Sequence, residues 1–184
     1  MVEKPALFVF RFEDLVVGLS INLERVASRV SELLGRRITP TSLDELYREI
    51  CSRMPAELES VVEEVLVEEE ERELAGAKME GAVVQSLLKL RRRGVGLVFT
   101  TALSEKCVSE FLRRQGLGFV YDRIYDRKRG LDEKSRVERV LKDYGVEGSR
   151  VVYVGRDASV SELGCLTLEP EEFLGPYSRE AEYY

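Results

Sequence analysis

The chain has 184 residues, of which 44% are hydrophobic and 34% charged, and its net charge is −6. This composition is typical of a globular protein and not of a disordered chain. No apolar run approaches the ~18 residues that a membrane span needs, and the first residues lack the basic and apolar regions of a signal peptide. We therefore expect a cytoplasmic protein without membrane association. The negative charge argues against general nucleic-acid binding.

The sequence contains no histidine. This excludes Ser-His-Asp catalysis, Cys-His catalysis and histidine metal sites. The cysteines Cys51, Cys107 and Cys165 form no CxxC pair, so we predict free thiols. Any chemistry must come from carboxylates, lysine, arginine, hydroxyl groups or backbone amides. The scarcity of Asn and Gln beside many charged residues is typical of a thermophile.

The first third of the chain predicts one strand followed by helices. Residues 6–12 are almost wholly apolar, which is typical of a strand buried on both faces. Apolar spacing and capping residues then predict helices over about 20–35 and 42–53 and from 55 onward. The last of these helices carries the acidic run Glu68–Glu71. We expect this run to be a solvated helix face, because adjacent residues cannot converge on one ion.

Beyond residue 76 the pattern alternates between helices and strands. We predict helices at 80–93, 104–114 and 132–144, strands at 95–100, 121–125, 150–155 and 165–168, and a helical turn at 159–163. The acidic, aromatic tail 177–184 is expected to be partly disordered. The alternation predicts an α/β fold with a Rossmann-like, mostly parallel sheet flanked by helices.

The helical stretch between the first two strands is too long for a simple crossover. We predict an α/β core formed by residues 1–18 and 77–184, with residues 19–76 inserted as a helical cap. Such a cap would cover the carboxyl ends of the strands, where ligands bind in folds of this kind. No GxGxxG or GxxxxGK[ST] motif follows the first strand, so dinucleotide and P-loop sites have no support. A receiver-like sheet would not hold an insertion of this length.

Several local strings resemble the haloacid dehalogenase-like superfamily with a small helical cap, over nearly the whole chain. The string Leu97-Val-Phe-Thr100 looks like its second motif, a strand that ends in Ser or Thr. Leu131-Asp-Glu-Lys134 before a helix is similar to the third motif with its lysine. Val151-Val-Tyr-Val-Gly155 is similar to the strand and glycine that open the fourth motif.

The resemblance implies Mg²⁺-dependent phosphoryl chemistry, with a first strand that ends in Asp-x-Asp and further aspartates in the fourth motif. This chain departs from that pattern. Arg11 stands at the nucleophile position and Glu13 at the acid/base position, while Asp14 falls on a glycine of the family turn. A guanidinium can neither attack phosphorus nor bind Mg²⁺. In the fourth motif Arg156 replaces a metal-binding Asp, and Asp157 is displaced by one residue.

Three interpretations of this site remain open. Only the third assigns catalytic or metal-binding residues. In the first, the old active site has become an anion site without metal or turnover, which takes a small phosphate-containing ligand. Its candidate residues are Arg11, Thr100, Thr101, Lys134 and Arg156.

In the second interpretation, the arginines pair with Glu13, Asp14 or Asp157, because a buried charge needs a partner. The fold would then be a scaffold or regulatory module with a protein partner, and the cap could also pair with a second copy. In the third, the same three carboxylates recreate a Mg²⁺ site in a shifted register, and the chain is an active phosphatase or hydrolase. We expect the enzyme activity to be absent and no cofactor to be needed unless this third interpretation holds.

Overall fold

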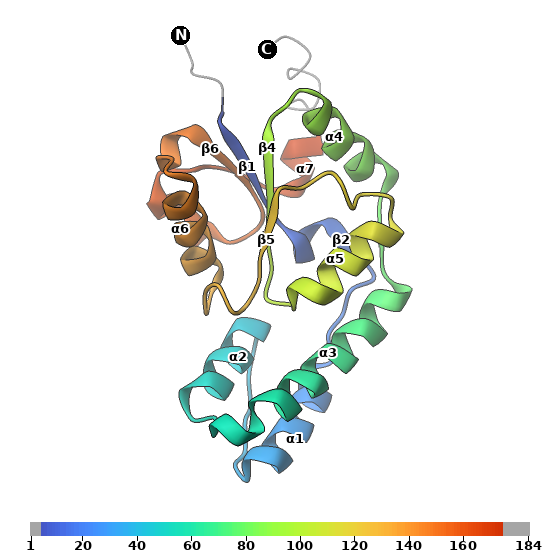
Figure 1. Cartoon of the computed structure of the whole chain (residues 1–184), viewed down its shortest axis with the longest axis vertical. Helices are drawn as coiled ribbons and strands as arrows, with labels where there is room; N and C mark the ends of the chain where they lie inside the picture. Colours follow the sequence, from blue (N-terminus) through green and yellow to red (C-terminus); the bar gives the residue numbers. More distant parts are fainter. Residues whose placement is uncertain (1–4, 175–184) are drawn as a thin grey trace.

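The computed structural model describes residues 5–174, and its centre is a parallel five-stranded sheet of order β5-β4-β1-β6-β7 (Figure 1). The predicted α/β fold with a parallel sheet is thereby confirmed. The predicted tail at 177–184 lies outside the described residues. The strands are β1 (Leu7–Arg11), β4 (Gly96–Thr100), β5 (Arg123–Tyr125), β6 (Val151–Val154) and β7 (Leu166–Leu168).

Helices cover both faces of this sheet and form a second, separate layer below it. The core helices are α4 (Gly81–Arg92), α5 (Glu105–Arg114), α6 (Glu133–Tyr144) and α7 (Pro170–Leu174). The inserted helices are α1 (Leu23–Leu34), α2 (Leu43–Ser52) and α3 (Glu59–Gly76). Short 3-10 turns are η1 (Phe12–Leu15), η2 (Ala56–Leu58), η3 (Gly148–Arg150) and η4 (Ala158–Leu163). No helix in the described part of the chain has both the length and the apolar character that a membrane crossing requires.

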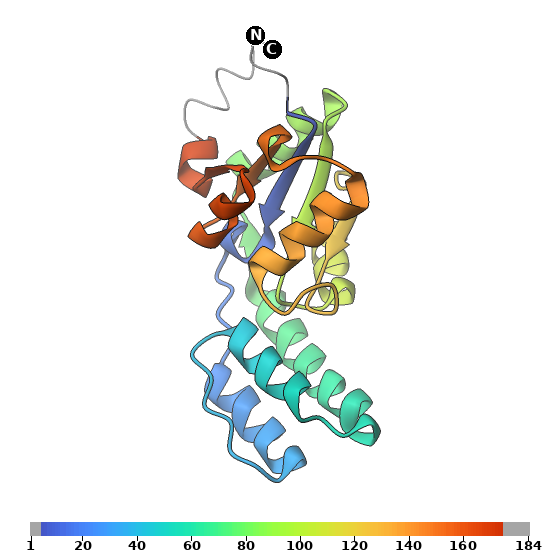
Figure 2. The ribbon, with the colours of Figure 1, turned by 90° about the vertical axis from the view of Figure 1, so that its left-hand side faces the viewer.

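The alternation of side chains along β1 divides the core into two apolar clusters. Phe8 and Phe10 belong to the cluster that also contains apolar residues of α4, α5 and α7. Leu7 and Val9 belong to the cluster on the α6 side. Because successive strand residues point to opposite faces, Arg11 continues the α6 side to the end of the strand. Figure 2 shows α6 lying along one face of the sheet.

The inserted helices bury an apolar cluster of their own, drawn entirely from residues 21–66. Leu46 and Ile50 of α2 and Val62 of α3 are fully buried in it. Farther along α3, Leu74 belongs to the core cluster instead, so this helix runs from the cap into the core (Figure 1). A two-stranded antiparallel pair, β2 (Val16–Val17) with β3 (Lys78–Met79), joins the two connections between cap and core.

The prediction that the acidic run Glu68–Glu71 on α3 is a solvated helix face is wrong in part. Glu69 is 1% exposed and Glu70 is 3% exposed, so the run is not a uniformly solvated face. Glu69 accepts hydrogen bonds from the guanidinium of Arg25 on α1, and Glu70 faces the core. Cys51, Cys107 and Cys165 are free thiols, as predicted.

Candidate functional site

Arg11 lies at the carboxyl end of β1, directly opposite Thr100 of β4. Its side chain is 25% exposed, and its guanidinium lies 4.0 Å from the carboxylate of Asp14. Burial lowers the pKa of Arg11, but the nearby carboxylates of Glu133 and Glu13 outweigh this effect and raise the pKa overall. The position that the resemblance assigns to a nucleophile therefore carries a permanent positive charge.

Glu13 turns its carboxylate toward the start of the loop after β4. Its Oε1 accepts hydrogen bonds from the hydroxyl of Thr101 at 2.9 Å and from the backbone N–H of Ala102 at 2.6 Å. The second oxygen is buried without a hydrogen-bond partner among the described residues. Burial raises the pKa of Glu13, although the charge of Arg11 opposes the shift. Glu13 is thus held by protein donors.

The most deeply buried carboxylate of the site is one that the sequence reasoning missed. Glu133, the first residue of α6, is 0% exposed and accepts a hydrogen bond from the hydroxyl of Thr100. Its other oxygen accepts from Arg136, at 3.2 Å from Nε and 3.1 Å from Nη2. Burial raises the pKa of Glu133, against the opposing charge of Arg136. Glu133 and Arg136 therefore form a buried ion pair beside Arg11.

Lys134 does not reach this cluster, contrary to its predicted place beside Thr100. Its ammonium group lies 2.5 Å from the carboxylate of Glu162 on η4. Successive helix residues are turned by about 100°, so only one of Glu133 and Lys134 can face the strand ends. The structure gives that place to Glu133.

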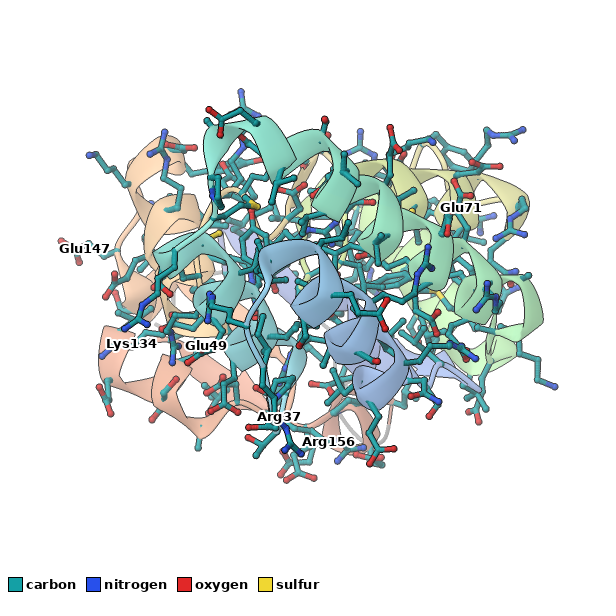
Figure 3. All side chains as sticks on the ribbon, turned by 90° about the horizontal axis from the view of Figure 1, so that it is seen from below. Arg37, Glu49, Glu71, Lys134, Glu147 and Arg156 are labelled. Carbon is teal, nitrogen blue, oxygen red and sulfur yellow. The ribbon has the colours of Figure 1, made fainter. Side chains whose placement is uncertain are left out.

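The guanidinium of Arg156 also pairs with carboxylates other than those beside Arg11. Its backbone N–H donates to Asp14 at 2.8 Å, while its guanidinium pairs with Glu169 at 3.2 Å and with Glu171. Figure 3 shows Arg156 and Lys134 at separate places on the surface seen from the cap side. The five anion-binding candidates are therefore not brought together: Arg11, Thr100 and Thr101 lie at the site, whereas Lys134 and Arg156 pair elsewhere.

Carboxylates outnumber guanidinium groups around Arg11. Four carboxylates surround two guanidiniums: Glu13, Asp14, Asp44 and Glu133 against Arg11 and Arg136. The guanidinium of Arg11 lies 4.0 Å from the carboxylate of Asp14 and stays partly exposed. Arg136 is paired within this group, with Asp44 and with Glu133.

The carboxylates predicted as possible Mg²⁺ ligands do not converge either. Asp14 accepts from the backbone of Arg156, and Glu13 is held by the loop after β4. Asp157 caps η4, where its Oδ1 accepts from the N–H of Ser159 at 3.0 Å. Among residues 5–174, no cluster of three or more carboxylate or thiol side chains has the arrangement of a metal site. With a guanidinium at the end of β1, these residues do not fit Mg²⁺.

Solved structures with a similar architecture identify the fold. The chain superposes over its full length on a haloacid dehalogenase-like family hydrolase from Streptococcus pneumoniae, with a TM-score of 0.62, 14% sequence identity and 100% of both chains covered. The chain has the haloacid dehalogenase-like fold. No protein-family model matches the sequence. A search of curated proteins finds no match either.

Other solved structures share this fold. A HAD-superfamily hydrolase of subfamily IA from Geobacter sulfurreducens has a TM-score of 0.59 and 18% identity, with 90% of this chain and 89% of that chain covered. A predicted phosphoglycolate phosphatase from Haemophilus somnus has a TM-score of 0.64 and 12% identity, with 92% and 86% covered. At these identities the likeness concerns the fold, and function must be argued from the site.

Proposed function

We propose that this chain is a haloacid dehalogenase-like protein without phosphohydrolase turnover, which serves as an interaction or regulatory module. The observation that carries the proposal is Arg11, whose guanidinium ends β1 opposite Thr100. Phosphoryl transfer through an aspartyl intermediate needs a carboxylate there, and a guanidinium is not a nucleophile.

The side chains beside Arg11 support the same proposal. Glu13 is held by Thr101 and Ala102, and Glu133 is paired with Arg136. Each group that could act on a substrate thus has a protein partner. Buried ion pairs of this kind stabilise one arrangement of the chain because breaking them leaves an uncompensated charge. The residues at the strand ends are therefore better suited to fixing the fold than to turning over a ligand.

Ligand-linked stability tests the proposal. A ligand that binds the native state at 100 times its Kd raises the free energy of unfolding by about 2.7 kcal/mol. We expect no saturable rise in Tm with MgCl₂, with inorganic phosphate or with both together. A saturable rise that disappears in the Glu13→Ala variant would support the Mg²⁺-dependent alternative. A rise with phosphate alone that disappears in the Arg11→Met variant would support the anion site instead.

The interaction part of the proposal has its own test. We expect the tagged chain to retain a protein partner in stoichiometric amount when it is isolated from native lysate. If size-exclusion chromatography of that preparation shows only the chain itself, as a monomer or with further copies of itself, the protein-partner proposal is contradicted. The absence of turnover is a separate claim and does not depend on this result.

A further inference from the structure

Positive charge gathers in one stretch of a chain that is acidic overall. Residues 89–123 contain eight Lys and Arg against three Asp and Glu, whereas the other residues contain 20 Lys and Arg against 31 Asp and Glu. The stretch covers the last turn of α4, the strand β4, the helix α5 and the connection from α5 to β5. Both helices pack on the same face of the sheet, on the right in Figure 1. A basic surface of this kind attracts partners of negative charge.

Four exposed cations in this stretch have no carboxylate partner. Lys89, Arg92 and Arg93 lie on one face at the end of α4, at positions i, i+3 and i+4. Arg113 lies in the last turn of α5. All four side chains are exposed, and none forms an ion pair within residues 5–174. The helix dipole favours cations at such ends, but three neighbouring cations on one face also repel one another. An acidic partner would relieve this repulsion.

The connection between α5 and β5, residues 115–122, contacts both helix ends. Arg91 of α4 lies 2.8 Å from the carboxylate of Asp122 in this connection. Gly118 lies against Arg113 of α5, because a Cβ at Gly118 would be 3.6 Å from the Cα of Arg113. An open groove of about 490 Å³ is lined by Lys106, Ser109, Glu110, Arg113, Gly118 and Tyr121. The groove and the basic end of α4 therefore both adjoin this connection.

Phe119 adds an exposed aromatic ring next to the groove. Its side chain is 65% exposed, the largest value for a large apolar side chain among residues 5–174. It directly follows Gly118, which lines the groove. Aromatic and arginine side chains are enriched in protein–protein interfaces, where the rings supply buried apolar area and the cations supply charge complementarity. An exposed ring beside unpaired arginines therefore has the chemistry of a surface that binds a protein.

We propose that this basic surface, which comprises the unpaired cations at the ends of α4 and α5 and the ring of Phe119, binds an acidic segment of a partner protein that carries an apolar side chain. The inference rests on the proposed function, for which it names the contact surface and the chemistry of the partner. Glu110 lines the groove among the cations. A peptide can place a neutral or positive group opposite this carboxylate, whereas a nucleic-acid strand carries a phosphate at every nucleotide. The acidic remainder of the chain would also repel a long polyanion. The charges therefore favour a short acidic peptide segment.

Fluorescence anisotropy on the full-length chain tests the basic surface. The probe is a labelled peptide of glutamates with one central phenylalanine, titrated at physiological ionic strength. We expect saturable binding that Arg92→Glu combined with Arg113→Glu weakens by about tenfold, because each reversal replaces an attraction with a repulsion. Phe119→Ser should weaken the binding by about fivefold, since the apolar contact is lost. Phe119→Leu keeps an apolar side chain and should retain most of the affinity.

The matched control is Arg53→Glu combined with Lys142→Glu, which reverses two exposed cations at the ends of α2 and α6, outside the basic surface. This control changes the net charge and two helix ends in the same way, and we expect it to weaken the binding by less than about twofold. The proposal is overturned by the absence of saturable peptide binding or by equal weakening in the control. It is also overturned if a single-stranded oligonucleotide or phosphatidylserine vesicles bind more tightly than the peptide. None of these measurements involves turnover or a lysate, so they can contradict this surface while the proposed function stands.

Discussion

Two side chains at the site carry the opposite charge from the one that the family resemblance implies. Arg11 stands where an aspartate nucleophile is expected, and Glu133 is the α6 side chain that reaches Thr100, where a lysine is expected. A reversal at one position alone would leave an uncompensated charge at the strand ends. With both positions reversed, a cation and an anion still face each other. Opposite charges thus still face each other, and a guanidinium stands where the resemblance implies a nucleophile.

Glu13 should make the stability of the protein fall as the pH rises. Its pKa in the folded state is raised by burial, so the native state binds this proton more tightly than the unfolded chain does. The stabilising contribution is complete below the unfolded pKa of about 4.3 and is lost as the pH rises through the folded pKa. Glu13→Gln lacks this titration. We therefore expect the variant to gain stability relative to the wild type as the pH rises from about 4 to 7.

Urea denaturation across that pH range measures the effect. Glu57 is exposed on η2, and Glu57→Gln provides the control, whose stability should follow that of the wild type at each pH. Parallel stability curves for the wild type and Glu13→Gln would show that burial does not govern the titration of Glu13.

At the scale of single elements, α3 uses two neighbouring carboxylates in different ways. Glu69 is 1% exposed and is held by Arg25 and Arg72, while Glu68 is exposed and paired with Arg29. We expect Glu69→Gln to lower the free energy of unfolding by about 2 kcal/mol, the scale of a hydrogen bond to a buried charge. Glu68→Gln should cost less than about 0.5 kcal/mol, as for an exposed pair. Equal losses for the two variants in chemical denaturation would contradict the distinction in burial.

For helix α6, the sequence predicts the position of the helix but not which of its charged residues are buried. The helix predicted over 132–144 is confirmed, and the side chain of Asp132 caps it by accepting a hydrogen bond from the N–H of Ser135. The resemblance then directs attention to Lys134, but the side chains that face the sheet are those of Glu133, Arg136, Val137 and Val140. These four follow the i, i+3, i+4, i+7 spacing of one helix face. This spacing is present in the sequence, but two of its four residues, Glu133 and Arg136, are charged, and charged residues predict an exposed face.

The acidic run on α3 could not be resolved in the same way. Its burial depends on Arg25, 44 positions away, and on Arg127, 57 positions away. Charged residues are almost never fully buried without a partner, so the sequence alone favours exposure. Only the tertiary fold brings the arginines and the glutamates together. In contrast, β1, β4 and β6 could be predicted because each is a short, mostly apolar run.

At the scale of the whole molecule, the sheet places the ends of β1, β4 and β6 side by side, and the cap lies below those ends (Figure 1). This arrangement is shared with hydrolases of the haloacid dehalogenase-like fold. In this chain Arg11 ends β1, and the carboxylates of Glu13, Asp14 and Glu133 are engaged with backbone N–H groups, hydroxyls or Arg136. The likeness therefore concerns the fold, and the role of the groups at the strand ends is a matter for the experiments.

Turnover of a generic phosphate ester in the presence of Mg²⁺ tests the central claim most directly. The assay uses p-nitrophenyl phosphate with the wild type and with Glu13→Ala, Asp14→Ala and Arg11→Met, purified in parallel. We predict that the wild type hydrolyses the ester no faster than buffer with MgCl₂ and that no variant differs from it. Wild-type hydrolysis that vanishes in Glu13→Ala or Asp14→Ala would contradict the account and show that these carboxylates support a live active site.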